Sequence, residues 1–229
     1  MPELMFYFSS LPEVLDAKRA FNENVVLCGQ QKDYYDIQIE GSLSLFSIVF
    51  HPHGLMKFFN LPLHEINKQN IPLKYLNKKL EQELMPKMED ASDFYSRVEL
   101  ANDFFYGLLN ENFGQYEFSR IQHIVETIRR TKGLIGIEDL ASEACLSRKQ
   151  FERVFCKYIG ATPKQFLKTV RFQHALHLKG RFQSMNITDL AYECAYFDQS
   201  HFIHEFKLQT GYTPKKYFDH NESFSDFFA

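Results

Sequence analysis

The sequence predicts an α+β protein in two parts: an N-terminal antiparallel β-sheet or partial barrel accompanied by helices, and then an all-α domain of seven helices that contains two helix-turn-helix units. Three observations predict this architecture. The N-terminal half holds short β-branched and aromatic runs, the C-terminal half holds apolar residues at helical spacing, and residues 137–166 recur imperfectly at 187–217. With 229 residues, 45% of them apolar, the chain can bury such cores.

The N-terminal half is expected to begin with strands, because its β-branched and aromatic runs are separated by Pro, Gly, Asn and Asp. The expected strands are residues 4–8, 24–28, 34–39 and 43–50. Residues 55–59 and 63–67 are then expected to form short helical turns, and residues 73–85 and 92–110 to form helices. One apolar stripe of the last helix is predicted to be buried: Phe94, Val98, Ala101, Phe105, Leu108 and Leu109.

Residues 113–118 interrupt the helical pattern and are the predicted linker between a domain of residues 1–112 and a helical domain of residues 119–220, with residues 221–229 as a tail. Ser119 is expected to cap the first helix of the helical domain, which would run to about Thr131 and end at Gly133. The buried face of that helix is predicted to hold Ile121, Ile124, Val125 and Ile128.

Capping residues mark the helices that follow. Residues that favour a helix start precede each expected helix: Gly136, Ser147, Thr162-Pro163, Asn186, Asp198 and Thr213-Pro214. Gly160 and Gly211 stand where the backbone turns left-handed at a helix end. The second helix of each repeat is predicted to bury Phe151, Val154 and Phe155 in the first copy and Phe202 and Phe206 in the second.

The repeat consists of two matched stretches with different offsets. Residues 137–143 recur 50 residues later, whereas the residues from Phe151 to Pro163 recur 51 residues later, so the extra residue falls where a turn is expected. A repeated short helix, turn and helix with basic residues points to DNA, because each unit can present one helix to one groove. The joining helix, residues 163–178, would span roughly 24 Å. With its flanking turns, it could separate two recognition helices by about the 34 Å of one duplex turn.

The net charge of −3 hides a difference between the two halves. Residues 1–114 carry 10 Lys and Arg against 16 Asp and Glu, whereas residues 119–220 carry 16 against 10. An acidic part joined to a basic part is consistent with a regulator that has separate sensing and DNA-binding domains.

Two helix faces are candidates for contact with DNA. The first repeat presents Arg148, Lys149, Glu152, Arg153 and Cys156 away from its apolar stripe, and the second presents Gln199, Ser200, His201 and His204, with Ile203 beside them. Arg and Lys can pair with guanine, Glu152 can accept from cytosine or orient Arg153, and Gln suits adenine. The alternative is that both faces are solvated surfaces of an ordinary helical domain. The greater positive charge of the first repeat leads us to expect that it dominates recognition.

These motifs resemble a known family. The pattern Ile-x-Asp-Leu-Ala, then Ser147-Arg-Lys-Gln-Phe-x-Arg-Val-Phe-x-Lys with Gly-x-Thr-Pro, and later Asp198-Gln-Ser-His-Phe-x-x-x-Phe-Lys with Gly-Tyr-Thr-Pro, resembles the double helix-turn-helix domain of AraC/XylS-type transcription regulators over about 100 residues. The resemblance implies that the second helix of each unit reads DNA. By position it implies base or backbone contacts for Lys149, Glu152, Arg153, Gln199, Ser200, His201 and His204.

Two positions depart from the family pattern. Many members have Gly-Phe before the second recognition helix and a basic residue at the place of His204, whereas this chain has Ala195-Tyr196-Phe197 and histidine. These departures imply that the second unit contributes less sequence discrimination or weaker phosphate affinity than the first.

The N-terminal half is less specifically similar to the sensor-like domain of some family members, through the Phe-x-Pro-x-Gly element that begins at Phe50. The resemblance implies a cytoplasmic regulator, an activator by family preference, in which residues 1–112 respond to an unidentified signal. The implied partners are double-stranded DNA, a small-molecule effector, a second copy of the chain and RNA polymerase. Such members have a further segment before the strand at residues 4–8. Either the domain is naturally shorter here, or the chain starts late and leaves that strand edge unpaired.

A second hypothesis starts from His51 and His53, since two histidines at this spacing on a strand could bind a metal in an enzyme of the cupin type that carries an accessory helical domain. Pro52 interrupts the strand and Gly54 follows at once, so a turn without metal is favoured. The sequence shows no Ser/His/Asp elbow, phosphate-binding glycine loop or paired catalytic carboxylates. We therefore expect neither catalysis nor a cofactor.

The sequence has no charged-then-apolar signal pattern and no run of about eighteen apolar residues, so neither secretion nor membrane insertion is expected. Its four cysteines, Cys28, Cys145, Cys156 and Cys194, form no C-x-x-C pair, which fits a reduced cytoplasm. Cys145 and Cys156 flank the first recognition helix and are expected to be buried and inert, the alternative being thiol control of DNA binding.

Overall fold

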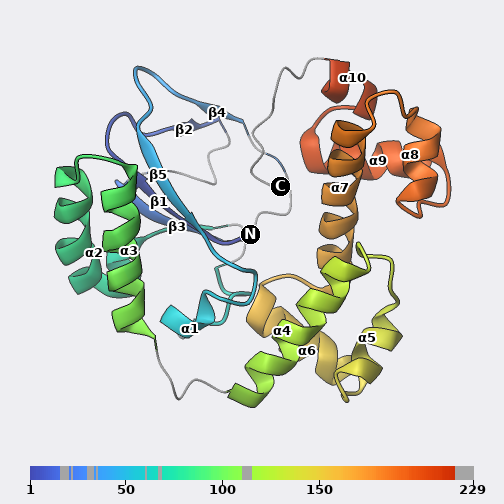
Figure 1. Cartoon of the computed structure of the whole chain (residues 1–229), viewed down its shortest axis with the longest axis horizontal. Coiled ribbons are helices and arrows are strands. Elements are labelled where there is room, and N and C mark those ends of the chain that lie inside the picture. Colours follow the sequence, from blue (N-terminus) through green and yellow to red (C-terminus); the bar gives the residue numbers. More distant parts are fainter. Residues whose placement is uncertain are drawn as a thin grey trace. The chain divides into compact units, whose positions relative to one another are not determined.

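The computed structural model describes residues 1–15, 21, 23–29, 34, 36–59, 61–66, 69–109 and 115–219. The chain divides into two compact parts (Figure 1). The first comprises Met1–Gln31, Tyr35–Gln122 and Arg153–Ala161, and the second comprises Lys32–Tyr34, His123–Glu152 and Thr162–Ala229. The predicted fold class is confirmed, because an antiparallel sheet with helices precedes an all-α region. The domain limits 1–112 and 119–220 stay a prediction.

A four-stranded antiparallel sheet lies at the centre of the first compact part. Its strands are β1 (Glu3–Tyr7), β3 (Val25–Cys28), β5 (Leu45–Val49) and β6 (Asn70–Pro72), in the order β5-β1-β3-β6. A separate pair joins β2 (Glu13–Val14) to β4 (Ile37–Gln38). β1 is paired on both sides, with Leu4 opposite Leu27 and Ile48, so of the two alternatives for this strand the one with an unpaired edge does not hold.

The four predicted strands are confirmed: β1 is shifted by one residue, the other three are shorter than expected, and β2 and β6 were missed. β6 has three residues and ends in a proline, which is too little for a period-2 pattern to mark it as a strand. All four residues of β3 are buried, as expected for an interior strand that is covered on both faces.

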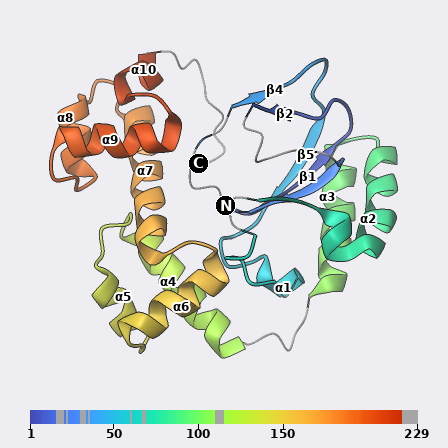
Figure 2. The same cartoon turned by 180° about the vertical axis from the view of Figure 1, so that it is seen from behind.

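Three helices accompany the sheet: α1 (Met56–Phe59), α2 (Leu73–Asp90) and α3 (Phe94–Leu108). α2 and α3 lie side by side, and α2 contacts β3 (Figures 1 and 2). α2 runs past its predicted end, and Asn77 interrupts it with φ −157° and ψ 92°. Residues 63–66 form turns, as expected, and residue 67 lies outside the described residues.

The apolar stripe predicted on α3 is only partly buried. Ala101 and Phe105 are buried, whereas Phe94 and Leu109 are exposed, so the prediction is wrong for these two side chains. The reason is their place at the ends of the helix: Phe94 is its first residue, directly after the cap Asp93, and Leu109 follows its last. The ring of Phe94 still contacts Phe46, at 5.6 Å between centroids.

Seven helices occupy the described residues 115–219, as predicted. They are α4 (Gln115–Arg130), α5 (Ile137–Glu143), α6 (Arg148–Ile159), α7 (Pro163–Arg181), α8 (Ile187–Glu193), α9 (Gln199–Thr210) and α10 (Pro214–Asp219). No helix in the described part of the chain is long and apolar enough to cross a membrane.

α4 begins four residues before its predicted cap at Ser119, so residues 115–118 of the predicted linker are helical. The physical reason is that the apolar stripe of Ile121 and Val125 extends one turn back to Phe118, which is 5% exposed. Residues 113 and 114 lie outside the described residues.

The other capping predictions are confirmed. Asp198 accepts a hydrogen bond from the backbone N–H of His201 at 2.7 Å, and the Ser147 hydroxyl accepts one from the N–H of Gln150 at 3.4 Å. Thr162 forms a capping box with Gln165 at the start of α7. Gly160 and Gly211 have φ of +79° and +77° after their helices.

The turn inside each helix-turn-helix unit contains a non-glycine residue in the left-handed conformation. Cys145 has φ +53° and Ala195 has φ +51°. The next backbone N–H reaches back five residues, from Leu146 to the carbonyl of Ala141 and from Tyr196 to that of Ala191, at 3.0 and 2.9 Å. Both turns are therefore Schellman motifs that carry a side chain where glycine is usual.

We expect Ala195→Gly to raise the free energy of unfolding by about 1 kcal/mol, because glycine has no Cβ to crowd the left-handed conformation. Urea unfolding would report a higher midpoint at an unchanged slope. Ala144→Gly is the matched control: Ala144 is the C-cap residue after α5 and has an ordinary right-handed conformation with φ −76°, so glycine there should lower stability, by about 1 kcal/mol. Equal responses of the two variants would contradict this account of the turn.

Candidate nucleic-acid interface

The first helix-turn-helix unit consists of α5, its turn and α6. α6 places Phe151 and Phe155 four residues apart on one face, and both side chains are fully buried. α5 buries Leu140 and Ala141 in the same way. Because these stripes take up the inner faces, the polar side chains at the start of α6 are left in contact with solvent.

The exposed start of α6 carries Arg148, but two carboxylates hold this side chain. Its Nη1 contacts Glu138 of α5, and its Nε donates to Glu152 at 3.1 Å. Hydrogen bonding to Glu152 and the charge of Glu138 raise the pKa of the Arg148 guanidinium. Arg148 therefore carries much less uncompensated charge than the sequence suggested.

Lys149 and Arg153 are exposed on the same helix, and no ion pair is recorded for either within the described residues. Glu152 is partly buried and turned toward Arg148, so it does not orient Arg153. Lys149 and Arg153 are therefore the positive charges of this face that no carboxylate recorded in the described part of the chain neutralises.

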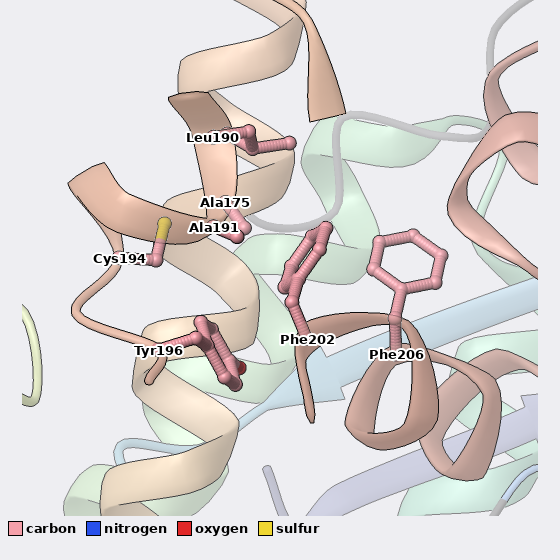
Figure 3. Close-up of a cluster of buried hydrophobic side chains, with 7 residues drawn as sticks. All are labelled: Ala175, Leu190, Ala191, Cys194, Tyr196, Phe202 and Phe206. Carbon is pink, nitrogen blue, oxygen red and sulfur yellow. The ribbon is translucent and has the colours of Figure 1, made fainter. Parts of the chain in front are cut away.

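The second unit consists of α8, its turn and α9, packed against α7. Figure 3 shows its core, in which the ring of Phe202 points toward Ala175 of α7 and Ala191 of α8. Cys194 is fully buried in this cluster, and burial raises the pKa of its thiol to about 11. Such a thiol stays protonated near neutral pH.

The exposed face of α9 carries the four predicted residues: Gln199, Ser200, His201 and His204. The amide oxygen of Gln199 accepts a hydrogen bond from the Thr188 hydroxyl at 3.1 Å. Gln199 and Thr188 occupy the repeat positions of Arg148 and Glu138, so the two units make the same contact between helices with different chemistry. The contact is ionic in the first unit and neutral in the second.

Sequence reasoning missed a buried acid on α9. Glu205 is 7% exposed, contacts Lys168 of α7 and lies 3.6 Å from His201. The His201 ring also packs edge-on against Tyr196, with centroids 5.5 Å apart. His201 is thus partly engaged within the fold. The repeat could have signalled this acid, because its counterpart in the first unit is the buried Val154.

α7 joins the two units and is longer than predicted. Its 19 residues, Pro163–Arg181, correspond to about 28 Å of helix. The capping box at Thr162 and the proline at the first helical position fix where α7 starts. Most of the chain between α6 and α8 is therefore the single helix α7.

His51 and His53 lie in the turn region after β5, with their rings stacked 5.9 Å apart. His51 is exposed, whereas His53 is buried and packs against Phe118, with centroids 5.2 Å apart. No group of three or more metal-binding side chains is found among the described residues. This arrangement gives the enzyme hypothesis no support.

The two cysteines near the first recognition helix differ from expectation. Cys145 is exposed and Cys156 is half-buried, so the prediction that both are buried is wrong. Cys145 is the left-handed residue of the tight turn, whose side chain projects outward.

The C-terminal half matches the model of a family described as "Helix-turn-helix domain" over residues 140–220. The domain is a double helix-turn-helix of the AraC/XylS type. Residues 2–72 match a family described as "Domain of unknown function (DUF6597)". The predicted family resemblance is thereby confirmed for the helical half.

Relatives with this AraC/XylS-type domain are named as transcription regulators. An uncharacterized HTH-type transcriptional regulator of Haemophilus influenzae is 37% identical over 35% of this chain and 27% of its own length. The activator RhaS of Klebsiella pneumoniae is 31% identical over 34% of this chain and 28% of its own length. RhaS of Mannheimia succiniciproducens is 22% identical over 84% of this chain and 76% of its own length. The chain thus spans about a quarter of the first two relatives.

Two solved structures are also similar. The DNA-binding domain of AdpA, in complex with a target DNA, has a TM-score of 0.41 and 25% identity over 44% of this chain and 90% of that one. ToxT from Vibrio cholerae has a TM-score of 0.47 and 12% identity over 97% of this chain and 91% of that one.

We expect Glu205→Ala to lower the free energy of unfolding by about 2 kcal/mol, because it leaves Lys168 without its carboxylate partner. Thermal and urea unfolding would measure the loss. Glu193→Ala is the control, since Glu193 is exposed on α8 and its removal should change stability by less than about 0.5 kcal/mol. If both variants unfold alike, Glu205 does not stabilise the second unit.

Proposed function

We propose that this protein is a sequence-specific DNA-binding transcription regulator in which α6 and α9 enter successive major grooves on one face of the duplex. The observation that carries the proposal is the duplication itself. Two units with the same turn, caps and buried stripe each leave the start of the second helix exposed and polar. In helix-turn-helix proteins this end of the recognition helix contacts base edges. The AraC/XylS-type domain and the names of the relatives support the same function.

In the first unit, Lys149 and Arg153 are proposed to read bases, preferably guanine. Arg148 is proposed to face a phosphate or a base. Because two carboxylates hold its guanidinium, it adds little to the net positive charge of this face. Glu152 is proposed to fix the position of Arg148, or to accept from cytosine N4. This division follows from the contacts that Glu152 makes in the fold.

In the second unit, Gln199 is proposed to pair with adenine, with Ser200 and His204 close to the backbone. His201 is proposed to contribute a backbone contact while it stays against Tyr196. The first unit keeps the larger positive charge, so it is proposed to dominate affinity.

The N-terminal domain, residues 1–112, is proposed to sense an unidentified small molecule and to carry contacts with a second copy of the chain. Activation through contact with RNA polymerase is proposed because the similar RhaS proteins are named activators. A regulator of this kind would act in the cytoplasm, with no catalytic activity and no cofactor of its own.

Arg153→Ala and Gln199→Ala should each weaken binding to a selected duplex by roughly tenfold, because each removes a base contact. The duplex is obtained by selection from random sequences with the full chain, and affinity is measured by fluorescence anisotropy. Lys87→Ala removes one exposed charge from α2 and serves as the control, which should bind within about twofold of the wild type. Wild-type affinity in both helical variants would contradict the proposed contacts.

Glu138→Gln should increase affinity for DNA and steepen its salt dependence by about 0.9 in the slope of log K against log salt, since Arg148 loses one neutralising carboxylate and its charge then counts toward a phosphate. Asp139→Asn is the matched control, because it removes the neighbouring exposed charge of α5 without touching the Arg148 pair. Equal slopes for the two variants would show that Glu138 does not restrain Arg148.

A further inference from the structure

Phe197 has the highest exposed fraction of the large apolar side chains in the described residues, at 87%. It lies directly before Asp198, the cap of α9. A phenyl ring so exposed costs free energy in water unless something covers it. Its place, at the start of the helix that is proposed to enter the groove, indicates what could do so.

Phe197 is the residue by which the two repeats differ in length. Cys145 and Ala195 share the left-handed conformation, and Ser147 and Asp198 share the cap position. Leu146 and Tyr196 make the same backbone hydrogen bond to the first helix, so they too are equivalent. Phe197 is therefore the added residue, present only in the turn of the second unit.

Packing within the second unit does not explain an aromatic residue here. An apolar residue before a helix cap often packs against the fourth helical residue, which in α9 is Phe202. Tyr196 makes that contact instead, with its ring centroid 5.0 Å from that of Phe202. Among the described residues, Phe197 is not part of the buried cluster of α7, α8 and α9 nor packed against it, and its side chain is 87% exposed. Its side chain is therefore free to meet a partner.

The one charged neighbour of Phe197 along the chain is Asp198, whose carboxylate is engaged as the cap of α9. The residues that begin α9, Gln199 and Ser200, are uncharged, and Gln199 is bound to Thr188. Ile203 is half-buried one turn further along the helix. An exposed apolar ring next to an amide suits an A·T pair, in which adenine offers a donor and an acceptor and thymine offers a methyl group.

We propose that Phe197 contacts thymine methyl groups in the major groove and gives the second unit a preference for A·T pairs. This inference rests on the proposed function, since it requires α9 to enter a groove. It assigns the two units different chemistry: charged groups read the first half-site, and an amide with an apolar ring reads the second.

The test uses the duplex selected by the full chain, in which each thymine is replaced in turn by deoxyuridine. This change removes one methyl group and leaves base pairing intact. Removal of a contacted methyl should weaken wild-type binding about fourfold. Phe197→Ala should bind more weakly and lose the difference between thymine and uracil at that position. Phe197→Leu should retain part of it. Tyr106→Ala, which removes a highly exposed aromatic residue of α3, should behave as wild type.

The inference is overturned if no thymine in the selected duplex responds to deoxyuridine, or if Phe197→Ala discriminates between the two bases as the wild type does. Unchanged DNA binding together with lost transcription activation in Phe197→Ala would assign the ring to a protein contact and would equally overturn it. Failure of the wild-type chain to select any duplex is a different result: it overturns the proposed function, and this inference falls with it.

Discussion

The tight left-handed turn is the constraint on which both helix-turn-helix units depend. Each turn folds one short helix back on the next through a backbone hydrogen bond that spans five residues. The second helix can then bury two phenylalanines and still leave its first turn exposed. Cys145 and Ala195 take up this conformation without being glycine, so the turn is held against a local conformational cost that the packing of the two helices offsets.

Features that depend on local sequence were predictable. Caps at Ser147, Thr162 and Asp198 and the left-handed Gly160 and Gly211 follow from residue type and spacing, and the structure confirms them. The buried stripes of the recognition helices followed from helical periodicity in the same way. The repeat also located the extra residue in the second turn, although only the hydrogen bonds of Leu146 and Tyr196 identify it as Phe197.

Features that depend on contacts between distant residues were not predictable. Arg148 looked like a free cation, but Glu138, ten residues earlier, faces it only once the turn is folded. Glu205 drew no prediction from the sequence, because its partner Lys168 lies 37 residues earlier, on α7. The start of α4 was misplaced because the polar residues before Phe118 concealed a further helical turn. Together these contacts change the proposed interface. The face of α6 keeps two cations without a recorded ion pair among the described residues, Lys149 and Arg153, and the face of α9 is nearly neutral.

The central claim, that one chain places two recognition helices in successive major grooves, is tested most directly by hydroxyl-radical footprinting of the full chain on its selected duplex, with the mass of the complex measured in parallel. The account predicts two protected patches on one face of the DNA, about 10 base pairs apart, with one chain per pair of patches. A single patch per chain, or two patches on opposite faces of the duplex, would contradict it.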